Sequence, residues 1–121
     1  MAKLFPQVIS VATQPCQTEL QLHIAADIHY FDGHFPDAPI LAGVTQLHWA
    51  VHYSKQYYPQ LTTVSAVEVL KFQVMIKPDS QLTLLLEHPK PDIILFSYLQ
   101  QGNKVASGRL KWQQPEYNTN V

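Results

Sequence analysis

A single long segment without helix breakers, set between strand-like stretches, most constrains how this chain can fold. After Gly43, neither proline nor glycine occurs until Pro59, and most of the residues between them suit a helix. Small or apolar residues recur in this segment at the i, i+3, i+4, i+7 spacing that buries one side of a helix. They are Leu47, Ala50, Val51 and Ser54. The pattern predicts one helix from Gly43 to about Tyr57 with that stripe buried.

The sequence on either side of this segment is typical of β-strands. In "TELQLHIA", Leu20, Leu22 and Ile24 alternate with polar residues, which predicts a half-buried strand. The apolar run "LFPQVISVA" before it indicates another, less regular strand. Strand-like runs follow the helix, joined by the turn-like sequences "KPDS", "PKPD" and "QGN". The expected fold class is α+β, with an antiparallel sheet wrapped around one long central helix.

Length and composition favour one domain that assembles with further copies. The chain has 121 residues, which predicts a single domain over 1–121 with a polar tail from about 114 to 121. Hydrophobic residues make up 46% of the chain and charged residues only 14%, so a homo-oligomer would hide part of the apolar surface. The net charge is −1 and the basic residues are scattered, which argues against a nucleic-acid partner.

The cysteine content and the N-terminal sequence favour a cytoplasmic protein. Cys16 is the only cysteine, so no internal disulfide can form, which fits a reducing compartment. The opening "MAKLFPQVIS" has neither the long apolar core nor the cleavage site of a signal peptide. No run approaches the roughly 18 apolar residues that a membrane span requires. We therefore expect a cytoplasmic protein with no membrane span.

The stretch "FDGHFPDAPILAGVTQL" groups several residues whose types and spacing suit a functional site. Its prolines and glycine lie among apolar residues, which predicts an ordered loop over residues 26–42. His34 lies between Gly33 and the pair Phe35–Pro36, in a turn that can aim one imidazole. Gly43 follows at the helix start, where unpaired amides and the helix dipole favour negative charge. A glycine there also lets a ligand approach the backbone closely.

This stretch resembles the signature of the hot-dog-fold 3-hydroxyacyl-[acyl-carrier-protein] dehydratases of bacterial fatty acid synthesis. A second segment, "LKFQVMIKPDSQL", is similar to a strand of that family, and the resemblance covers roughly residues 20 to 112. The likeness extends to a divergent branch in aryl-polyene and related lipid pathways. The matching residues of the signature are Gly33, His34, Phe35, Pro36, Pro39, Ile40, Gly43 and Val44.

The resemblance implies how the residues would divide the reaction. His34 would be the base that removes a proton next to the thioester carbonyl, since an imidazole titrates close to working pH. The amides of Gly43 and Val44 would receive the carbonyl oxygen. Gly33, Phe35 and Pro36 would support the loop. The substrate would be an acyl thioester on acyl carrier protein, the active unit a homodimer, and no cofactor would be needed.

The sequence departs from the family at the position of its helix carboxylate. That position is His48, and the family's proline before the helix glycine is Ala42. His48 could act as the acid that protonates the departing hydroxyl, directly or through a water, or it could pack at a helix edge or a dimer contact. His52 is expected to be structural or exposed. The His48–His52 spacing would suit a metal, but no third ligand is indicated, so we predict no metal site.

Two other functions remain open on the same fold. A hot-dog thioesterase would use activated water, but such enzymes generally place an Asp or Glu base near the helix and lack the Gly-His-Phe-Pro turn. The missing helix carboxylate also allows a non-catalytic acyl-thioester-binding homologue. The sequence leaves open the acyl chain, the pathway, any isomerase activity, and the choice among dimer, larger oligomer and hetero-dimer.

Overall fold

The computed structural model of the chain describes residues 5–25 and 43–113. Two strands precede one helix and four strands follow it, in the predicted order. The elements are β1 (Gln7–Gln14), β2 (Gln17–Ile24), α1 (Gly43–Tyr57), β3 (Val64–Phe72), β4 (Ser80–Lys90), β5 (Ile93–Gln100) and β6 (Asn103–Trp112). The predicted loop 26–42 and the tail 114–121 lie outside the described residues.

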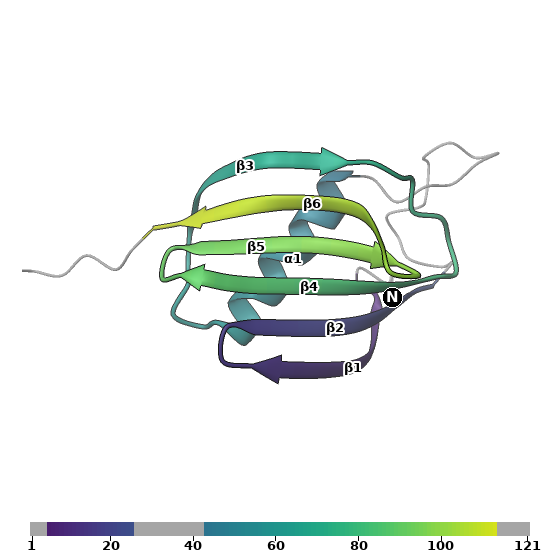
Figure 1. Ribbon diagram of the computed structural model, residues 1–121, viewed down its shortest axis with the longest axis horizontal. Helices are drawn as coiled ribbons and strands as arrows, with labels where there is room; N and C mark the ends of the chain where they lie inside the picture. Colours follow the sequence, from purple (N-terminus) through teal and green to yellow (C-terminus); the bar gives the residue numbers. More distant parts are fainter. Residues whose placement is uncertain (1–4, 26–42, 114–121) are drawn as a thin grey trace, which may run out of the picture.

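The six strands form one antiparallel sheet in the order β1-β2-β4-β5-β6-β3. Three of them, β4, β5 and β6, form the predicted meander. The helix lies behind the sheet and crosses it diagonally, from the end of β3 toward the hairpin of β1 and β2 (Figure 1). The turn after β4 falls at Pro91–Asp92, because β4 runs through His88 to Lys90 instead of ending before "PKPD". The expected α+β class is confirmed.

The core lies between one face of this sheet and the helix. Leu20, Leu22 and Ile24 are fully buried, as their alternation predicted. Strand β4 pairs with β2 in register and contributes a matching buried row, because cross-strand partners share a face. That row consists of Leu82, Leu84 and Leu86. The intervening side chains point to the opposite face of the sheet.

The buried side of α1 differs from the predicted stripe. Ala50 and Ser54 are buried, but Leu47 and Val51 only pack partly against the core. Trp49, which lies outside the stripe, is as fully buried as Ala50 and Ser54, because the helix turns its large aromatic side chains toward the sheet, where they bury the most area. The buried helix residues are Thr45, Gln46, Trp49, Ala50, Tyr53 and Ser54.

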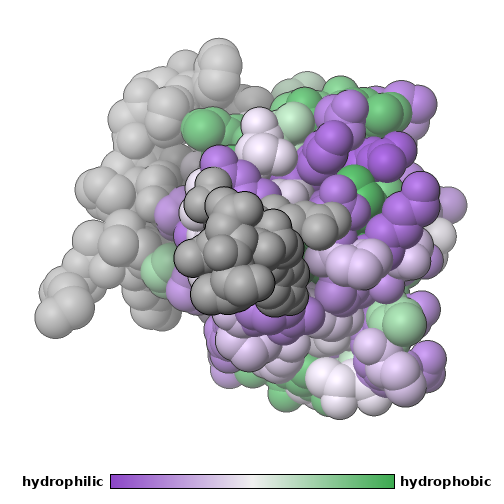
Figure 2. All heavy atoms as spheres, turned by 90° about the vertical axis from the view of Figure 1, so that its left-hand side faces the viewer, coloured by the Kyte–Doolittle hydropathy of each residue, from purple (hydrophilic) through white to green (hydrophobic). Residues whose placement is uncertain are grey.

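Both edge strands of the sheet carry exposed apolar side chains. On β1 these are Val8, Ile9 and Val11, and on β3 they are Val67, Val69, Leu70 and Phe72. Figure 2 shows hydrophobic surface at the top, on the side of β3, and at the bottom, on the side of β1, with mostly hydrophilic surface between them. Val67 and Phe72 pair with the buried Leu110 and Ala106 of β6, so they share the face of the sheet that holds the helix.

Candidate functional site

The start of α1 brings together three of the residues that the sequence singled out. Gly43 is the first helical residue, Val44 is 74% exposed beside it, and His48 is exposed one turn further along. The first amides of a helix have no acceptor within the helix. This end of α1 therefore offers N–H donors and an imidazole on the same short stretch of backbone. His34, Gly33, Phe35 and Pro36 lie outside the described residues, so their predicted places stay predictions.

Phe72, at the end of β3, fits against Gly43. A β-carbon built on Gly43 would lie 2.8 Å from Cε2 of the Phe72 ring, which is too close for a real side chain. Gly43 is therefore required here for close packing of an aromatic ring on the backbone. The ring remains 45% exposed and forms a wall beside the first amides of the helix. No local sequence pattern indicates this contact, because the two residues lie 29 positions apart in the chain.

The imidazole of His48 faces the N-terminal segment instead of the core. The ring of Phe5 stacks on it at a centroid distance of 5.9 Å and also lies 4.4 Å from the ring of His52. Burial, and then the neighbouring His48 and Lys55, lower the pKa of His52 below its usual value. His52 is exposed, as expected. Its lowered pKa favours the neutral imidazole.

Beneath the helix start, one buried hydrogen bond ties α1 to the sheet. The hydroxyl of Tyr98 in β5 donates to the main-chain oxygen of Gln46 at 2.6 Å. Burial, with a smaller contribution from the phenol of Tyr53, raises the pKa of Tyr98 well above its usual value, so this hydroxyl stays protonated. Sequence reasoning treated "IILFSYLQ" as strand packing and missed this bond. The available signal was a tyrosine on a core-facing position, since a buried phenol needs a partner.

A second buried hydrogen bond holds the region just past the other end of the helix. The hydroxyls of Tyr58 and Thr18, in β2, lie 3.1 Å apart. Tyr58 follows the last helical residue, and its amide donates to the main-chain oxygen of Ser54 at 2.8 Å. None of the predicted site residues lies at this end.

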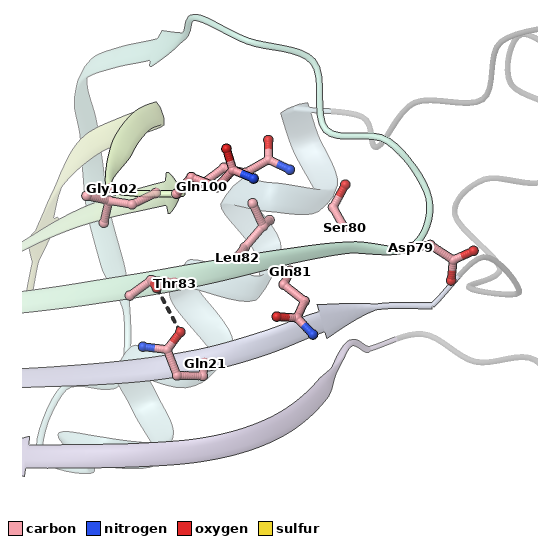
Figure 3. Close-up of a pocket in the computed structure, with 10 residues that line it drawn as sticks. Gln21, Asp79, Ser80, Gln81, Leu82, Thr83, Gln100 and Gly102 are labelled. Atoms are coloured by element: carbon pink, nitrogen blue, oxygen red, sulfur yellow. Dashed lines mark hydrogen bonds between the residues drawn. The ribbon is translucent and has the colours of Figure 1, made fainter.

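A polar hollow lies on the face of the sheet opposite the helix, away from the residues at the start of α1. It encloses about 590 Å³ at the ends of β2, β4 and β5, with neutral amides and hydroxyls such as Gln21, Gln81 and Thr83 on its wall. In Figure 3, the hydroxyl of Thr83 donates to Oε1 of Gln21 at 2.8 Å, and α1 lies behind the sheet. Among the described residues of its lining, none is a histidine that could act as a base, and Asp79 is the one charged residue.

Neither a metal cluster nor a membrane-spanning helix is found in the part of the chain that the structure describes. Within residues 5–25 and 43–113, no three His, Cys, Asp or Glu side chains gather closely enough to hold a metal ion. In the same ranges, no helix combines the length and hydropathy that crossing a bilayer requires.

Two solved structures resemble this fold over most of the chain. The fold matches a chain of the dehydratase heterocomplex ApeI:P from Xenorhabdus doucetiae with a TM-score of 0.82 and 29% identity, over 91% of this chain and 99% of that one. It also matches an uncharacterized protein from Erwinia carotovora subsp. atroseptica with a TM-score of 0.72 and 29% identity, over 91% and 97% of the two chains. No curated protein matches the sequence.

The family assignment comes from the sequence itself. The family model of the ApeI dehydratase matches residues 10–109, which is most of the chain. Together with the six-stranded antiparallel sheet and its single described helix, this match confirms the expected hot-dog fold and the expected kinship with dehydratases. The chain belongs to the ApeI-like dehydratase family.

Proposed function

We propose that the protein removes water from a 3-hydroxyacyl thioester, carried on acyl carrier protein, to give the 2-enoyl thioester of a polyene-type lipid pathway. The observation that carries the proposal is the open start of α1, where the amides of Gly43 and Val44 precede the exposed imidazole of His48. A thioester oxygen that gains charge during proton removal needs such preorganised donors. Membership of a dehydratase family supports the reaction class.

In the proposed reaction, a named residue carries out each proton transfer and stabilises the charge that develops. His34 takes the proton from C2, and the amides of Gly43 and Val44 stabilise the charge that develops on the carbonyl oxygen. The C3–O bond then breaks, the C2–C3 double bond forms, and a protonated His48 gives its proton to the departing hydroxyl, which leaves as water. His34 ends with one proton more and His48 with one fewer, so exchange with solvent restores both.

The test is turnover of 3-hydroxyacyl and 2-enoyl thioesters linked to acyl carrier protein or to pantetheine, followed as gain or loss of one water and as free thiol. We expect water exchange without thiol release. Replacing His34 with Ala should lower the rate by about 10²-fold or more, because general acid–base catalysis contributes about 10²–10⁴-fold. His23→Ala, on β2 and 3.7 Å from Asp79, is the matched control and should keep the parent rate.

Three results would count against this proposal. Retention of the rate by His34→Ala within a few fold would remove its central base. Thiol release would indicate a thioesterase instead. Saturable binding of every thioester without any turnover would indicate the non-catalytic homologue that the absence of the helix carboxylate allows.

We also propose that the active unit is a homodimer formed along β3. This edge strand carries the exposed Val67, Leu70 and Phe72, of which Phe72 lies beside the start of α1, and an exposed apolar edge strand is a template for pairing with another chain. A partner chain paired with β3 would cover these three apolar side chains and enclose the amides of the helix start. Exclusion of water from that place would strengthen the electrostatic stabilisation that the reaction needs.

Introducing a charged side chain among the exposed apolar residues of β3 tests the proposed dimer. Val67→Glu should convert the dimer to monomer in sedimentation velocity and lower turnover, because the carboxylate would be buried without a partner. Val11→Glu is the control on the opposite edge strand, since Val11 is 38% exposed and Val67 is 40% exposed. If Val67→Glu remains a dimer, or if Val11→Glu dissociates it equally, the dimer does not form along β3.

A further inference from the structure

The side chain of Tyr98 connects the start of α1 to the centre of the sheet. This residue is fully buried in β5, and its hydroxyl reaches the carbonyl oxygen of Gln46 at 2.6 Å. Gln46 lies three positions after Gly43, in the first turn of the helix, so the bond holds the same turn whose amides begin the helix. In a regular helix this oxygen also accepts from the amide of Ala50, so the phenol is a second donor to one carbonyl.

The ring of Tyr98 is itself fixed in place by its neighbours. Phe96 packs edge-to-face against it, with ring centroids 6.0 Å apart and an interplanar angle of 76°. The Phe96 ring in turn occupies the space above Gly108, where a β-carbon would lie 2.5 Å from its Cε2 atom. Ala106, the partner of Tyr98 across the sheet, is also small. Small residues of β6 therefore leave room for the two aromatic rings, and the phenol has little freedom to move.

We propose that Tyr98 is a positioning residue of the dehydration, which holds the first turn of α1 so that the amides of Gly43 and Val44 keep their aim at the thioester oxygen. This inference rests on the proposed function. Tyr98 is buried beneath the helix and acts through the backbone of Gln46, not by touching the substrate. Loss of the hydrogen bond would let the turn move away from the sheet, and a displacement of about 1 Å in a catalytic group can cost about 10²-fold in rate.

The chain provides a matched control for removing a phenol hydroxyl. Tyr58 is also buried and hydrogen-bonded, but it lies just past the other end of α1, where its partner is Thr18. Tyr98→Phe and Tyr58→Phe thus delete the same atom at opposite ends of one helix. Both should lower the free energy of unfolding, since each leaves a buried acceptor or hydroxyl with one partner fewer. Only the Tyr98 change should alter the reaction.

The experiment measures turnover of a 2-enoyl pantetheine thioester and amide hydrogen exchange in the parent and in both variants. We expect Tyr98→Phe to lower kcat roughly tenfold or more with KM within about twofold, and to speed exchange at Ala50 and the turn before it. Tyr58→Phe should keep kcat within about twofold and speed exchange only near its own end of the helix. A lower kcat with an unchanged KM indicates that positioning was lost while substrate binding was kept.

Two outcomes would overturn the inference. One is a Tyr98→Phe enzyme with parental kcat, and the other is an equal loss of kcat in both variants, which would indicate general destabilisation. If the parent itself turns over no thioester, the proposed function fails, and the exchange data still decide whether Tyr98 holds the turn. Unchanged exchange at the amide of Ala50 and in the turn before it in Tyr98→Phe would then overturn the anchoring role by itself.

Discussion

The two ends of helix α1 are built differently. At its start, Gly43 has no side chain, Val44 and His48 are exposed, and the ring of Phe72 lies directly on the backbone. At its end, the buried hydroxyl of Ser54 donates to the main-chain oxygen of Ala50 at 2.7 Å, and Tyr58 is fixed to β2. Among the described residues, the start of the helix carries exposed side chains around a bare glycine, whereas the other end is fixed by buried hydrogen bonds.

If the helix start receives the substrate as proposed, this difference predicts that function and stability are separated along the helix. The end is held by several buried side chains, so it contributes to the fold. At the start, apolar side chains of α1 and β3 are exposed, and the hydroxyl of Tyr98 donates a hydrogen bond to Gln46 from the sheet. Substitutions at the start should therefore change turnover more than stability, and substitutions at the end should do the opposite.

Among substitutions within α1, the largest expected effect on turnover is that of Gly43→Ala. The added methyl would displace the Phe72 ring and crowd the first amides, so we expect a fall in turnover of about 10²-fold. The free energy of unfolding should change little, because a gain in helix propensity of up to about 1 kcal/mol offsets the displacement of a half-exposed ring.

A second glycine substitution controls for Gly43→Ala. Gly102 has a φ of +79° and no neighbour within 4 Å of an added β-carbon, so Gly102→Ala should cost about 1 kcal/mol of stability without a change in turnover. Stability comes from denaturant unfolding and turnover from the thioester assay. Parental turnover in Gly43→Ala would mean that the helix start does not receive the substrate.

A smaller effect is expected at His48. His48→Ala should lower turnover by about tenfold, less than His34→Ala, if the imidazole supplies the proton to the leaving hydroxyl. His48→Glu should retain or raise turnover, since it restores the carboxylate that the resemblance places there. His52→Ala, one turn further along the helix, is the control and should have no effect on the rate. A His48→Ala enzyme as active as the parent would make His48 a packing residue beside Phe5.

The smallest effect on turnover is expected at the anchored end. Thr18→Val removes the partner of the buried Tyr58 hydroxyl without changing side-chain size much, and should cost about 1–3 kcal/mol of unfolding free energy. Turnover per folded molecule should match the parent, measured well below the unfolding transition. A rate loss as large as that of Gly43→Ala would erase the distinction between the two ends.

Local patterns in the sequence predicted much of the fold but only part of the site. The helix begins and ends at the predicted residues, and the alternation of Leu20, Leu22 and Ile24 identified a core face, because both signals depend on neighbours in the chain. The rotation of α1 was misjudged, since burial of Trp49 depends on how the sheet curves around the helix.

The contacts that the sequence could not supply are long-range ones. Phe72 on Gly43 and Tyr98 on Gln46 each join residues far apart in the chain, and no local pattern indicates either contact. By contrast, Gly43 and His48 were found from a short signature at one helix start. The predicted base, His34, still depends on that signature, since it lies outside the described residues.

The most direct test of the central claim is the fate of the oxygen atom of water. The protein is incubated with a 2-enoyl pantetheine thioester in water enriched in heavy oxygen, and the products are analysed by mass spectrometry. A dehydratase, which runs reversibly, should place the label in the hydroxyl of an intact 3-hydroxyacyl thioester, and His34→Ala should place almost none. Label found only in a free carboxylic acid, or no label in any product, would contradict the account.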